Sequence, residues 1–346
     1  MSGASRITIP VRSSRRGRPA LLPWFSLLIG LAALVASAAG CRADIRALMG
    51  PPKTIEVNGV TRLYYLEAPK PVQAGKRYSL VILLHGLGGD PISVADYTGF
   101  ARLARKANFF LVCPLAEGDP TVWSVGLNTG LHDPTDVEFF STLIDHLEKT
   151  LPVDPDRVFV AGHSSGAMMA DRLASEISDK IAAIGVVAGT VGARDADGKL
   201  VVLHPPARPV SVIAFHGDHD PIMPYSTGDT WAYNANFFSA AQSIDFWVKA
   251  DGCPAADRKV TKKPDVIEDD YPHGRDNTEV ILYSVIGGDH WWPGDRADAA
   301  YIAPADEAID ATSLIWKFFQ SHPRHAETNP APNKPGPGPA SVRLEK

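Results

Sequence analysis

Acidic residues are absent from the first 40 positions of the sequence, although these positions hold five arginines. The remaining chain has 29 basic residues against 39 acidic ones, a net charge of −10, whereas the whole chain of 346 residues has −5. A protein this acidic lacks the positive surface that binds nucleic acids or anionic membranes, so we expect neither partner. Internal repeats are also lacking, and 45% hydrophobic with 21% charged residues excludes a disordered or fibrous chain.

Residues 1–40 have the pattern of an export signal, in which a basic region precedes an apolar run over 20–39. The small residues directly before Cys41 resemble a bacterial lipobox, in which the cysteine is lipidated and becomes the mature N-terminus. The Ala-Ser-Ala sequence at 36–38 also suits ordinary signal cleavage, and the run is long enough for an uncleaved membrane anchor. We therefore predict an exported protein, either secreted or held outside the cell membrane as a lipoprotein.

The chain has three cysteines, Cys41, Cys113 and Cys253. If Cys41 carries a lipid, the other two form an even pair in an oxidising compartment, where a disulfide is permitted. Cys113 ends an apolar run and equally suits a buried thiol. The sequence leaves both states open.

Beyond the signal, the pattern predicts a tether over 41–53, one folded domain over 54–322 and a disordered, proline-rich tail over 323–346. Asn58-Gly59 lies between alternating polar and apolar residues, which indicates an N-terminal antiparallel hairpin.

Strands and helices alternate at short spacing through the domain, which favours a mainly parallel, doubly wound α/β sheet. Residues 78–84 form a near-continuous apolar run, typical of a strand buried on both faces. Residues 192–206 are expected to be a linker, and 265–276 a solvated loop. The expected strands after the hairpin are 78–84, 109–113, 158–160, 181–187, 209–215 and 279–285, and the expected helices are 93–106, 136–150, 167–177, 236–250 and 305–320.

The most informative stretch is Gly162-His163-Ser164-Ser165-Gly166, where a strand pattern changes abruptly into a helix pattern. Glycines at the first and last positions allow the sharp strand-to-helix turn that lifts a serine hydroxyl into the open. This Gly-x-Ser-x-Gly pattern predicts Ser164 as a nucleophile.

A serine hydroxyl needs a histidine base, and the histidine needs a carboxylate to orient it. In a parallel sheet the ligand site lies beyond the carboxyl ends of the strands. Asp220 follows the strand at 209–215, and His290 follows the strand at 279–285. We therefore predict a triad of Ser164, Asp220 and His290, with Asp218 in the same turn as the alternative acid.

An oxyanion hole requires two backbone N–H donors. The residue after the nucleophile, Ser165, supplies one, and the glycine-rich loop after residues 78–84 supplies the other. Leu87 is the preferred second donor, and Gly88 stays open as an alternative.

Four segments together resemble the bacterial poly(3-hydroxybutyrate) depolymerase and feruloyl or acetylxylan esterase family of α/β-hydrolases. They are HGLGG, DPDRVFVAGHSSGAMM, HGDHDPIMPY and GGDHWWPG. The resemblance covers about 54–320 and implies Ser164, Asp220 and His290 as the triad and an extracellular carboxylic ester as the substrate. The chain departs from the family's usual glycines at Ala167 and Asp289.

The leading prediction is a cofactor-independent serine esterase that hydrolyses polyhydroxyalkanoate, feruloyl or acetyl-sugar esters. Trp123, Trp291 and Trp292 are candidate substrate-binding residues, although tryptophans in such positions are as often packing residues.

Three alternatives remain. A peptidase or thioesterase could use the same triad, and a surface binding protein could keep the fold without turnover. A metal-dependent hydrolase would need His216, Asp218, His219 and Asp220, or a calcium site within 265–276. The first set lacks a recognised ligand spacing and the second is more simply a solvated loop, so we predict no metal.

Overall fold

The computed structural model describes residues 44–127, 135–194, 198–226, 228–230, 235–294 and 308–324. The predicted export signal, Cys41 and nearly all of the predicted tail lie outside these residues. Within the described ranges, no helix is both long and apolar enough to cross a membrane.

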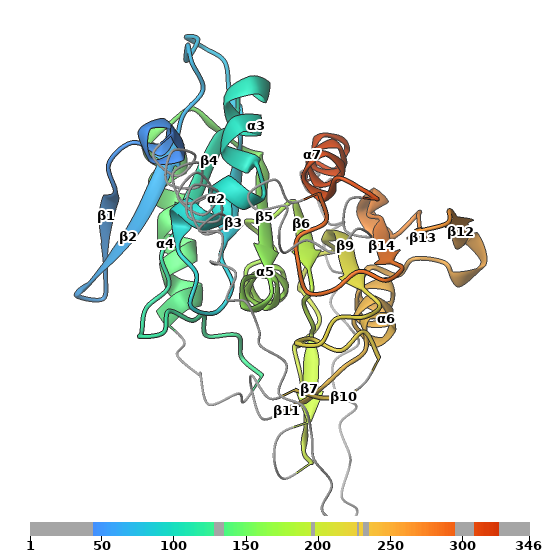
Figure 1. Cartoon of the computed structure of the whole chain (residues 1–346). Coiled ribbons are helices and arrows are strands. Elements are labelled where there is room, and N and C mark those ends of the chain that lie inside the picture. Colours follow the sequence, from blue (N-terminus) through green and yellow to red (C-terminus); the bar gives the residue numbers. More distant parts are fainter. Residues whose placement is uncertain are drawn as a thin grey trace, which may run out of the picture. The chain divides into compact units, whose positions relative to one another are not determined.

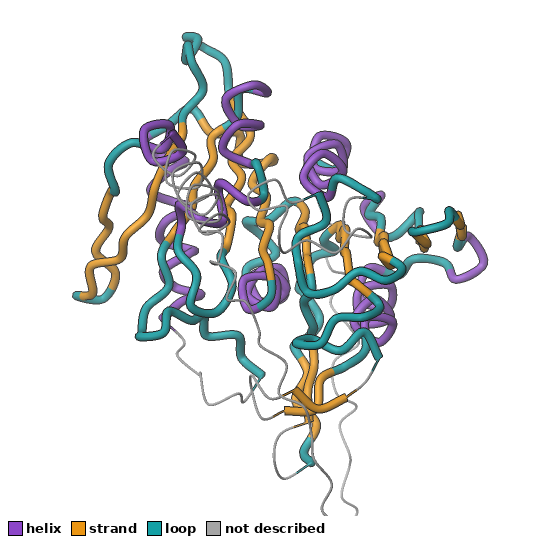
Figure 2. Tube along the Cα trace, viewed as in Figure 1, coloured by secondary structure: helices purple, strands orange, loops and turns teal. Residues whose placement is uncertain are grey.

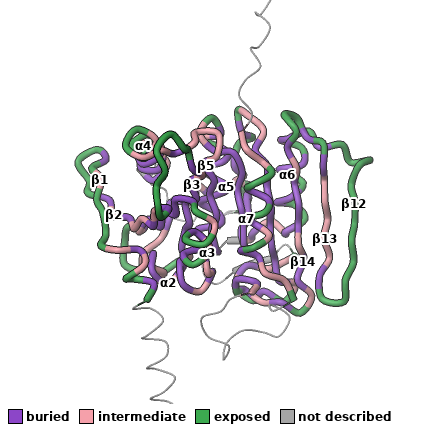
Figure 3. Tube along the Cα trace, turned by 90° about the horizontal axis from the view of Figure 1, so that it is seen from above, coloured by how far each residue is buried: buried purple, intermediate pink, exposed green. Residues whose placement is uncertain are grey.

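The centre of the fold is a ten-stranded sheet with the strand order β1-β2-β4-β3-β5-β6-β9-β14-β13-β12. Its middle six strands, from β4 to β14 in that order, pair in parallel. These strands are almost wholly buried because helices cover both faces (Figure 3). Their bounds are β3 Tyr78–Leu84, β4 Phe110–Pro114, β5 Val153–His163, β6 Ala183–Val187, β9 Ser211–Gly217 and β14 Val280–Val285.

Antiparallel strands close the sheet at both ends. The predicted hairpin is β1 (Lys53–Val57) and β2 (Val60–Glu67), which turn at Asn58-Gly59. At the other end, β12 (Lys259–Lys262) and β13 (Val266–Tyr271) pair antiparallel with β14. The solvated loop predicted for 265–276 is therefore wrong for 266–271, because acidic side chains can occupy the partly exposed face of a strand near the sheet edge.

Alternate residues of the buried strands enter two cores, one on each face of the sheet. Along β3, Leu80, Ile82 and Leu84 belong to one core, whereas Val81 and Leu83 belong to the other. The first core packs against α4 (Thr135–Thr150), α5 (Ser165–Glu176) and α6 (Ala240–Asp251). The second packs against α2 (Pro91–Tyr97), α3 (Phe100–Ala107) and α7 (Ala311–Ser321), which lie on the opposite side of the sheet (Figure 1).

The predicted mainly parallel, doubly wound sheet with its N-terminal hairpin is confirmed. Some local expectations differ. The single helix predicted for 93–106 is two helices, because Gly99 between them adopts a left-handed conformation with φ 74°. Residues 44–49, assigned to the tether, are helical, and Ile45 and Met49 are buried in the second core.

The linker predicted for 192–206 instead contributes to a small four-stranded sheet, with order β10-β11-β7-β8 (Figure 2). Its strands are β7 Gly192–Arg194, β8 Leu200–Val202, β10 Gly228–Thr230 and β11 Ala235–Phe237. The helix predicted from residue 236 begins after Ser239 because Ser239 and Gln242 form a capping box. Two short 3-10 helices, Ala255–Asp257 and Arg275–Asn277, complete the described elements.

Cys113 and Cys253 are buried free thiols. Cys113 lies in the core under α2, α3 and α7, whereas Cys253 lies in the core on the other face of the sheet. The sheet separates the two sulfur atoms, so the permitted disulfide between these residues is not formed.

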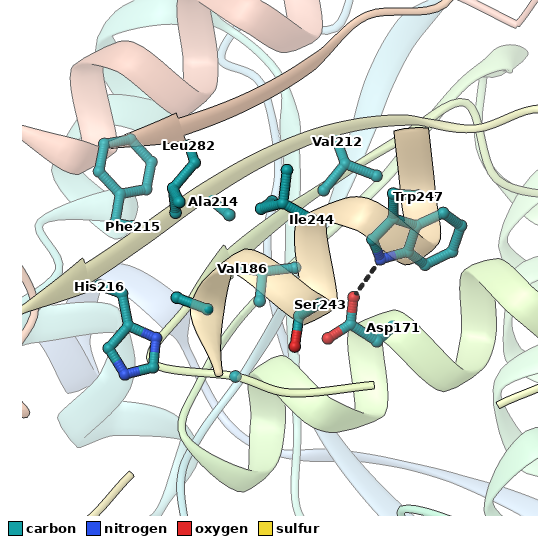
Figure 4. Close-up of a pocket in the computed structure, with 12 residues that line it drawn as sticks. Asp171, Val186, Val212, Ala214, Phe215, His216, Ser243, Ile244, Trp247 and Leu282 are labelled. Carbon is teal, nitrogen blue, oxygen red and sulfur yellow. Dashed lines mark hydrogen bonds between the residues drawn. The ribbon is translucent and has the colours of Figure 1, made fainter. Parts of the chain in front are cut away.

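A buried carboxyl joins α5 to α6. The Asp171 side chain is 2% exposed and accepts a 2.9 Å hydrogen bond from the Trp247 indole N–H. Both residues line a mainly apolar pocket of ≈20 Å³, with His216 at its other end (Figure 4). Burial raises the pKa of Asp171 to about 8, although the Trp247 hydrogen bond acts in the opposite direction. The side chain is therefore held as a neutral acid at neutral pH.

We expect Asp171→Asn to flatten the pH dependence of stability. An unfolded aspartate ionises near pH 3.9, whereas the native group keeps its proton up to about pH 8. Between these values the native state binds more protons, so the wild type loses about 1.4 kcal/mol of unfolding free energy per pH unit as the pH rises. Asparagine preserves the hydrogen-bond acceptor and cannot ionise. Denaturant unfolding between pH 6 and pH 9 measures the difference.

The matched control is Asp179→Asn, since Asp179 is exposed near the end of the same segment of chain. Its stability should follow that of the wild type across the whole pH range. Parallel pH curves for Asp171→Asn and the wild type would contradict the buried neutral acid.

Candidate active site

Ser164 occupies the sharp turn between β5 and α5. Its backbone has φ 55° and ψ −121°, a conformation that a non-glycine residue adopts only under strain. A side chain at Gly162 would place its Cβ 2.2 Å from the Gly166 carbonyl oxygen. A side chain at Gly166 would place its Cβ 2.5 Å from the Leu84 carbonyl oxygen. Both glycines are therefore needed for the close approach of β3, β5 and α5.

The turn is also held from the neighbouring strand. His163 pairs with Val187 of β6, and the Ser164 N–H donates to the Val187 carbonyl at 2.9 Å. The parallel ladder thus continues one residue past the end of β5. The nucleophile candidate is fixed on the rigid centre of the sheet.

Asp220 lies in the turn after β9 and bonds to His290. Its Oδ2 accepts from the His290 Nδ1–H at 2.8 Å, and its Oδ1 accepts from the N–H groups of Ile222 and Met223, both at 2.8 Å. Burial alone would raise the pKa of Asp220. Hydrogen bonding and the charge of His290, with contributions from His216 and Met223, lower it below its ordinary value. The buried carboxyl is therefore ionised and orients His290.

Asp218 makes different contacts. Its Oδ1 accepts from the Gly287 N–H and from His219 Nδ1, both at 2.6 Å, so it fastens the β9 turn to the loop after β14. Gly217 lies against the same loop, since a Cβ there would come within 2.3 Å of the Asp289 carbonyl oxygen. Of the two acids, the structure brings Asp220 to His290.

Ser164 and His290 share a cavity of ≈340 Å³ at the carboxyl ends of the central strands. Besides these two residues, its lining is formed by Gly86, Leu87, Gly88, Gly89, Tyr97, His163, Ile222 and Trp291. The lining is mostly apolar, and its reactive groups are gathered around Ser164. A cavity of this size admits a small acyl or aryl group.

The loop after β3 lies directly against Ser164, because a Cβ on Gly86 would come within 3.3 Å of the Ser164 Cβ. The Gly88 N–H donates to the Thr121 carbonyl at 2.7 Å. In the described part of the chain, the Leu87 and Ser165 N–H groups have no protein acceptor. The arrangement leaves Leu87, and not Gly88, available beside Ser165 as a donor to a ligand oxygen.

The three candidate tryptophans have different positions. Trp291 is 44% exposed and lines the cavity. Trp123 is fully buried and donates to the His85 carbonyl at 2.9 Å, and Trp292 is fully buried and donates to the Thr312 hydroxyl at 2.9 Å. The prediction that Trp123 and Trp292 bind substrate is therefore wrong, because both rings are buried in the protein interior and both indole N–H groups are hydrogen-bonded within the protein.

Three further histidines surround the site. His85 accepts from the Ala116 N–H at 3.1 Å, His216 donates to the Met223 carbonyl at 2.7 Å, and His163 bonds to the His290 carbonyl at 2.7 Å. Burial lowers the pKa of each, that of His163 to about 4, so all three are neutral. All three histidines lie in the sequence motifs, but the backbone groups to which they hydrogen-bond are known only from the structure.

The metal alternative finds no matching arrangement. Among the described residues, no group of three or more His, Cys, Asp or Glu side chains is arranged to hold a metal ion. Within the predicted cluster, His219 bonds to Asp218, whereas His216 bonds to the Met223 carbonyl.

Comparison with known proteins gives consistent results. A protein of Nocardia uniformis subsp. tsuyamanensis named as an esterase, NocK, is 29% identical over 75% of this chain and 81% of its own length. Feruloyl esterase D of Neurospora crassa is 26% identical over 85% of this chain and 94% of its own length. The acetyl xylan esterase of Aspergillus awamori superposes with a TM-score of 0.54 at 14% identity, covering 78% of this chain and 99% of its own, and shares the fold.

Sequence relatives named as feruloyl and acetylxylan esterases confirm the predicted resemblance to those enzymes, while the resemblance to poly(3-hydroxybutyrate) depolymerases stays a prediction. Residues 81–323 match the alpha/beta hydrolase family, and they include the strained serine, the acid turn after β9 and the histidine loop after β14. The chain belongs to the alpha/beta hydrolase family.

Proposed function

We propose that this α/β hydrolase is an exported serine esterase with Ser164 as nucleophile, His290 as base and Asp220 as the orienting acid. The observation that carries the proposal is the combination of a strained serine and an Asp220–His290 pair at one cavity. The esterase names of its relatives support the same reaction class.

Each group has a defined task in this reaction. His290 takes the proton of the Ser164 hydroxyl as the oxygen attacks the ester carbonyl, and the N–H groups of Leu87 and Ser165 stabilise the oxyanion. His290 then gives the proton to the leaving alcohol. Water, activated by the same histidine, hydrolyses the acyl-enzyme and releases the acid.

The substrate is proposed to be an ester with a compact acyl group, of the feruloyl, acetyl-sugar or hydroxyalkanoate type. Leu87, Ile222 and Trp291 give the cavity its apolar side, and Trp291 is exposed enough to contact an aromatic or sugar ring. Relatives named as feruloyl and acetylxylan esterases support the first two types.

Ser164→Ala should lower kcat for short p-nitrophenyl esters by about 1000-fold or more, because the variant lacks the proposed nucleophile. It should also abolish covalent labelling by a fluorophosphonate probe. The measurement compares feruloyl, acetyl-sugar, hydroxybutyrate, thioester and peptide substrates for the chain from residue 42 onward.

Ser141→Ala is the control, because Ser141 lies on α4 outside the cavity lining. A folded wild type that is neither labelled nor active would instead indicate a binding protein. Preferential cleavage of peptides or thioesters would replace the esterase assignment by one of those activities.

Asp220→Asn should reduce kcat by about 1000- to 10,000-fold, because the amide would favour the wrong tautomer of His290. Asp218→Asn, two positions away in the same turn, should change kcat only a few-fold, since asparagine can still accept from Gly287. Steady-state kinetics on one ester compare the two variants after circular dichroism shows that both are folded. The reverse order of effects would assign the acid role to Asp218.

Export is proposed from the sequence of residues 1–40, and lipidation from the residues around Cys41. The two proposals are separable, because a secreted form would lose the signal without gaining a lipid.

When the full chain is expressed in a bacterium that processes lipoproteins, the wild type should incorporate labelled palmitate and partition into detergent. Cys41→Ser should lose both properties, because the thiol that carries the lipid is gone. Electrophoresis of labelled cells, followed by detergent phase separation, measures the outcome. A mature protein in the medium that begins after Ala38 would show ordinary secretion instead.

A further inference from the structure

His163, the residue before the candidate nucleophile, contacts the candidate base through the backbone. It is the last residue of β5, is 6% exposed, and its Nε2 lies 2.7 Å from the His290 carbonyl oxygen. The rings of His163 and His290 also lie 5.1 Å apart between centroids, tilted by 35°. One side chain thus joins the strand that carries Ser164 to the loop that carries His290.

The protonation of His163 follows from its partners. A backbone carbonyl only accepts hydrogen bonds, so Nε2 must carry a hydrogen and donate it to His290. Nδ1 then has a free lone pair and accepts from the Tyr97 hydroxyl at 3.0 Å. Burial lowers the pKa of His163 to about 4, helped by the charge of His290, so the neutral Nε2–H form persists at neutral pH.

The loop that carries His290 is held at several points, and His163 supplies one of them. Gly288 is fixed by hydrogen bonds to Val285 and His219, and the Pro293 carbonyl accepts from the Ala311 N–H at 3.0 Å. Between these points, Asp220 holds the His290 ring and His163 holds its carbonyl. Trp292, fully buried against Phe100, also makes a T-shaped contact with the His163 ring, with the ring centroids 6.2 Å apart.

We propose that His163 is a positioning residue that sets the separation of Ser164 and His290 by holding the His290 carbonyl from the end of β5. This inference rests on the proposed triad, because it assigns His163 a role through His290. Tyr97 acts one step further away, by fixing the tautomer in which His163 can donate. Small displacements of a base relative to a nucleophile cost rate, because proton transfer and attack need aligned atoms.

The test compares His163→Leu with His163→Gln on one short p-nitrophenyl ester. Leucine removes the donor, and kcat should fall about 10- to 100-fold with KM changed less than about three-fold. Glutamine can donate from its amide nitrogen to the His290 carbonyl and accept from Tyr97, so it should restore most of kcat. His146→Leu, on the exposed face of α4, is the matched control and should keep wild-type kinetics.

The outcomes separate this inference from the proposed function. An active wild type whose His163→Leu variant keeps kcat within two-fold would overturn the positioning role alone. Equal losses in the leucine and glutamine variants would overturn it too, because the donor would then not be what matters. A wild type that is neither labelled by fluorophosphonate nor active would overturn the proposed function and this role with it.

If the leucine variant does not fold, nitrogen-15 NMR of labelled histidines in the wild type decides. The His163 signal, assigned by its loss in His163→Gln, should show a protonated Nε2 and an unprotonated Nδ1 at neutral pH. A protonated Nδ1 with a bare Nε2 would overturn the inference, since that tautomer cannot donate to a carbonyl.

Discussion

The close approach of β3, β5 and α5 at Gly162 and Gly166 is the constraint on which the site depends. Any Cβ at these positions would lie within about 2.5 Å of a backbone oxygen, far inside van der Waals contact. The approach forces Ser164 into φ 55°, a conformation whose strain of order 1–3 kcal/mol the surrounding sheet must hold. The ladder between β5 and β6, extended by the Ser164 N–H to Val187, supplies that restraint at the buried centre of the sheet.

The parallel sheet brings the loops of the remaining site residues together. β3, β5, β9 and β14 run in the same direction, so their carboxyl ends meet at one edge and deliver the loops of Leu87, Ser164, Asp220 and His290 to one cavity. Gly217 lets the β9 and β14 loops touch, which places Asp220 within hydrogen-bonding distance of His290. Strand order and the close approach at Gly217 therefore make neighbours of residues that are distant in sequence.

The features that depend on local residue pattern or on strand order could be predicted from the sequence. Apolar runs predicted the buried strands, Asn58-Gly59 predicted the hairpin, and acids and histidines after strands predicted which loops meet. Features set by distant partners could not be predicted. Trp123 and Trp292 face inward because their indole N–H groups donate to the His85 carbonyl and the Thr312 hydroxyl. The carbonyl that His163 contacts lies 127 residues away in the sequence. The strand at 266–271, which lies next to the edge strand β12, was missed because three consecutive acidic residues, 268–270, interrupt the alternation of polar and apolar side chains.

The charges at the site depend on how many hydrogen bonds each buried ionisable group receives. Asp220 is buried but accepts from Ile222, Met223 and His290, and these bonds keep it ionised. Asp171 accepts from one donor among the described residues and stays neutral, as His163 and His216 do beside the site. A single buried negative charge thus faces His290, and no neighbouring buried histidine competes for it at neutral pH. In the mechanism proposed above, that one carboxylate stabilises the proton that His290 takes from Ser164, which is the charge balance a serine hydrolase requires.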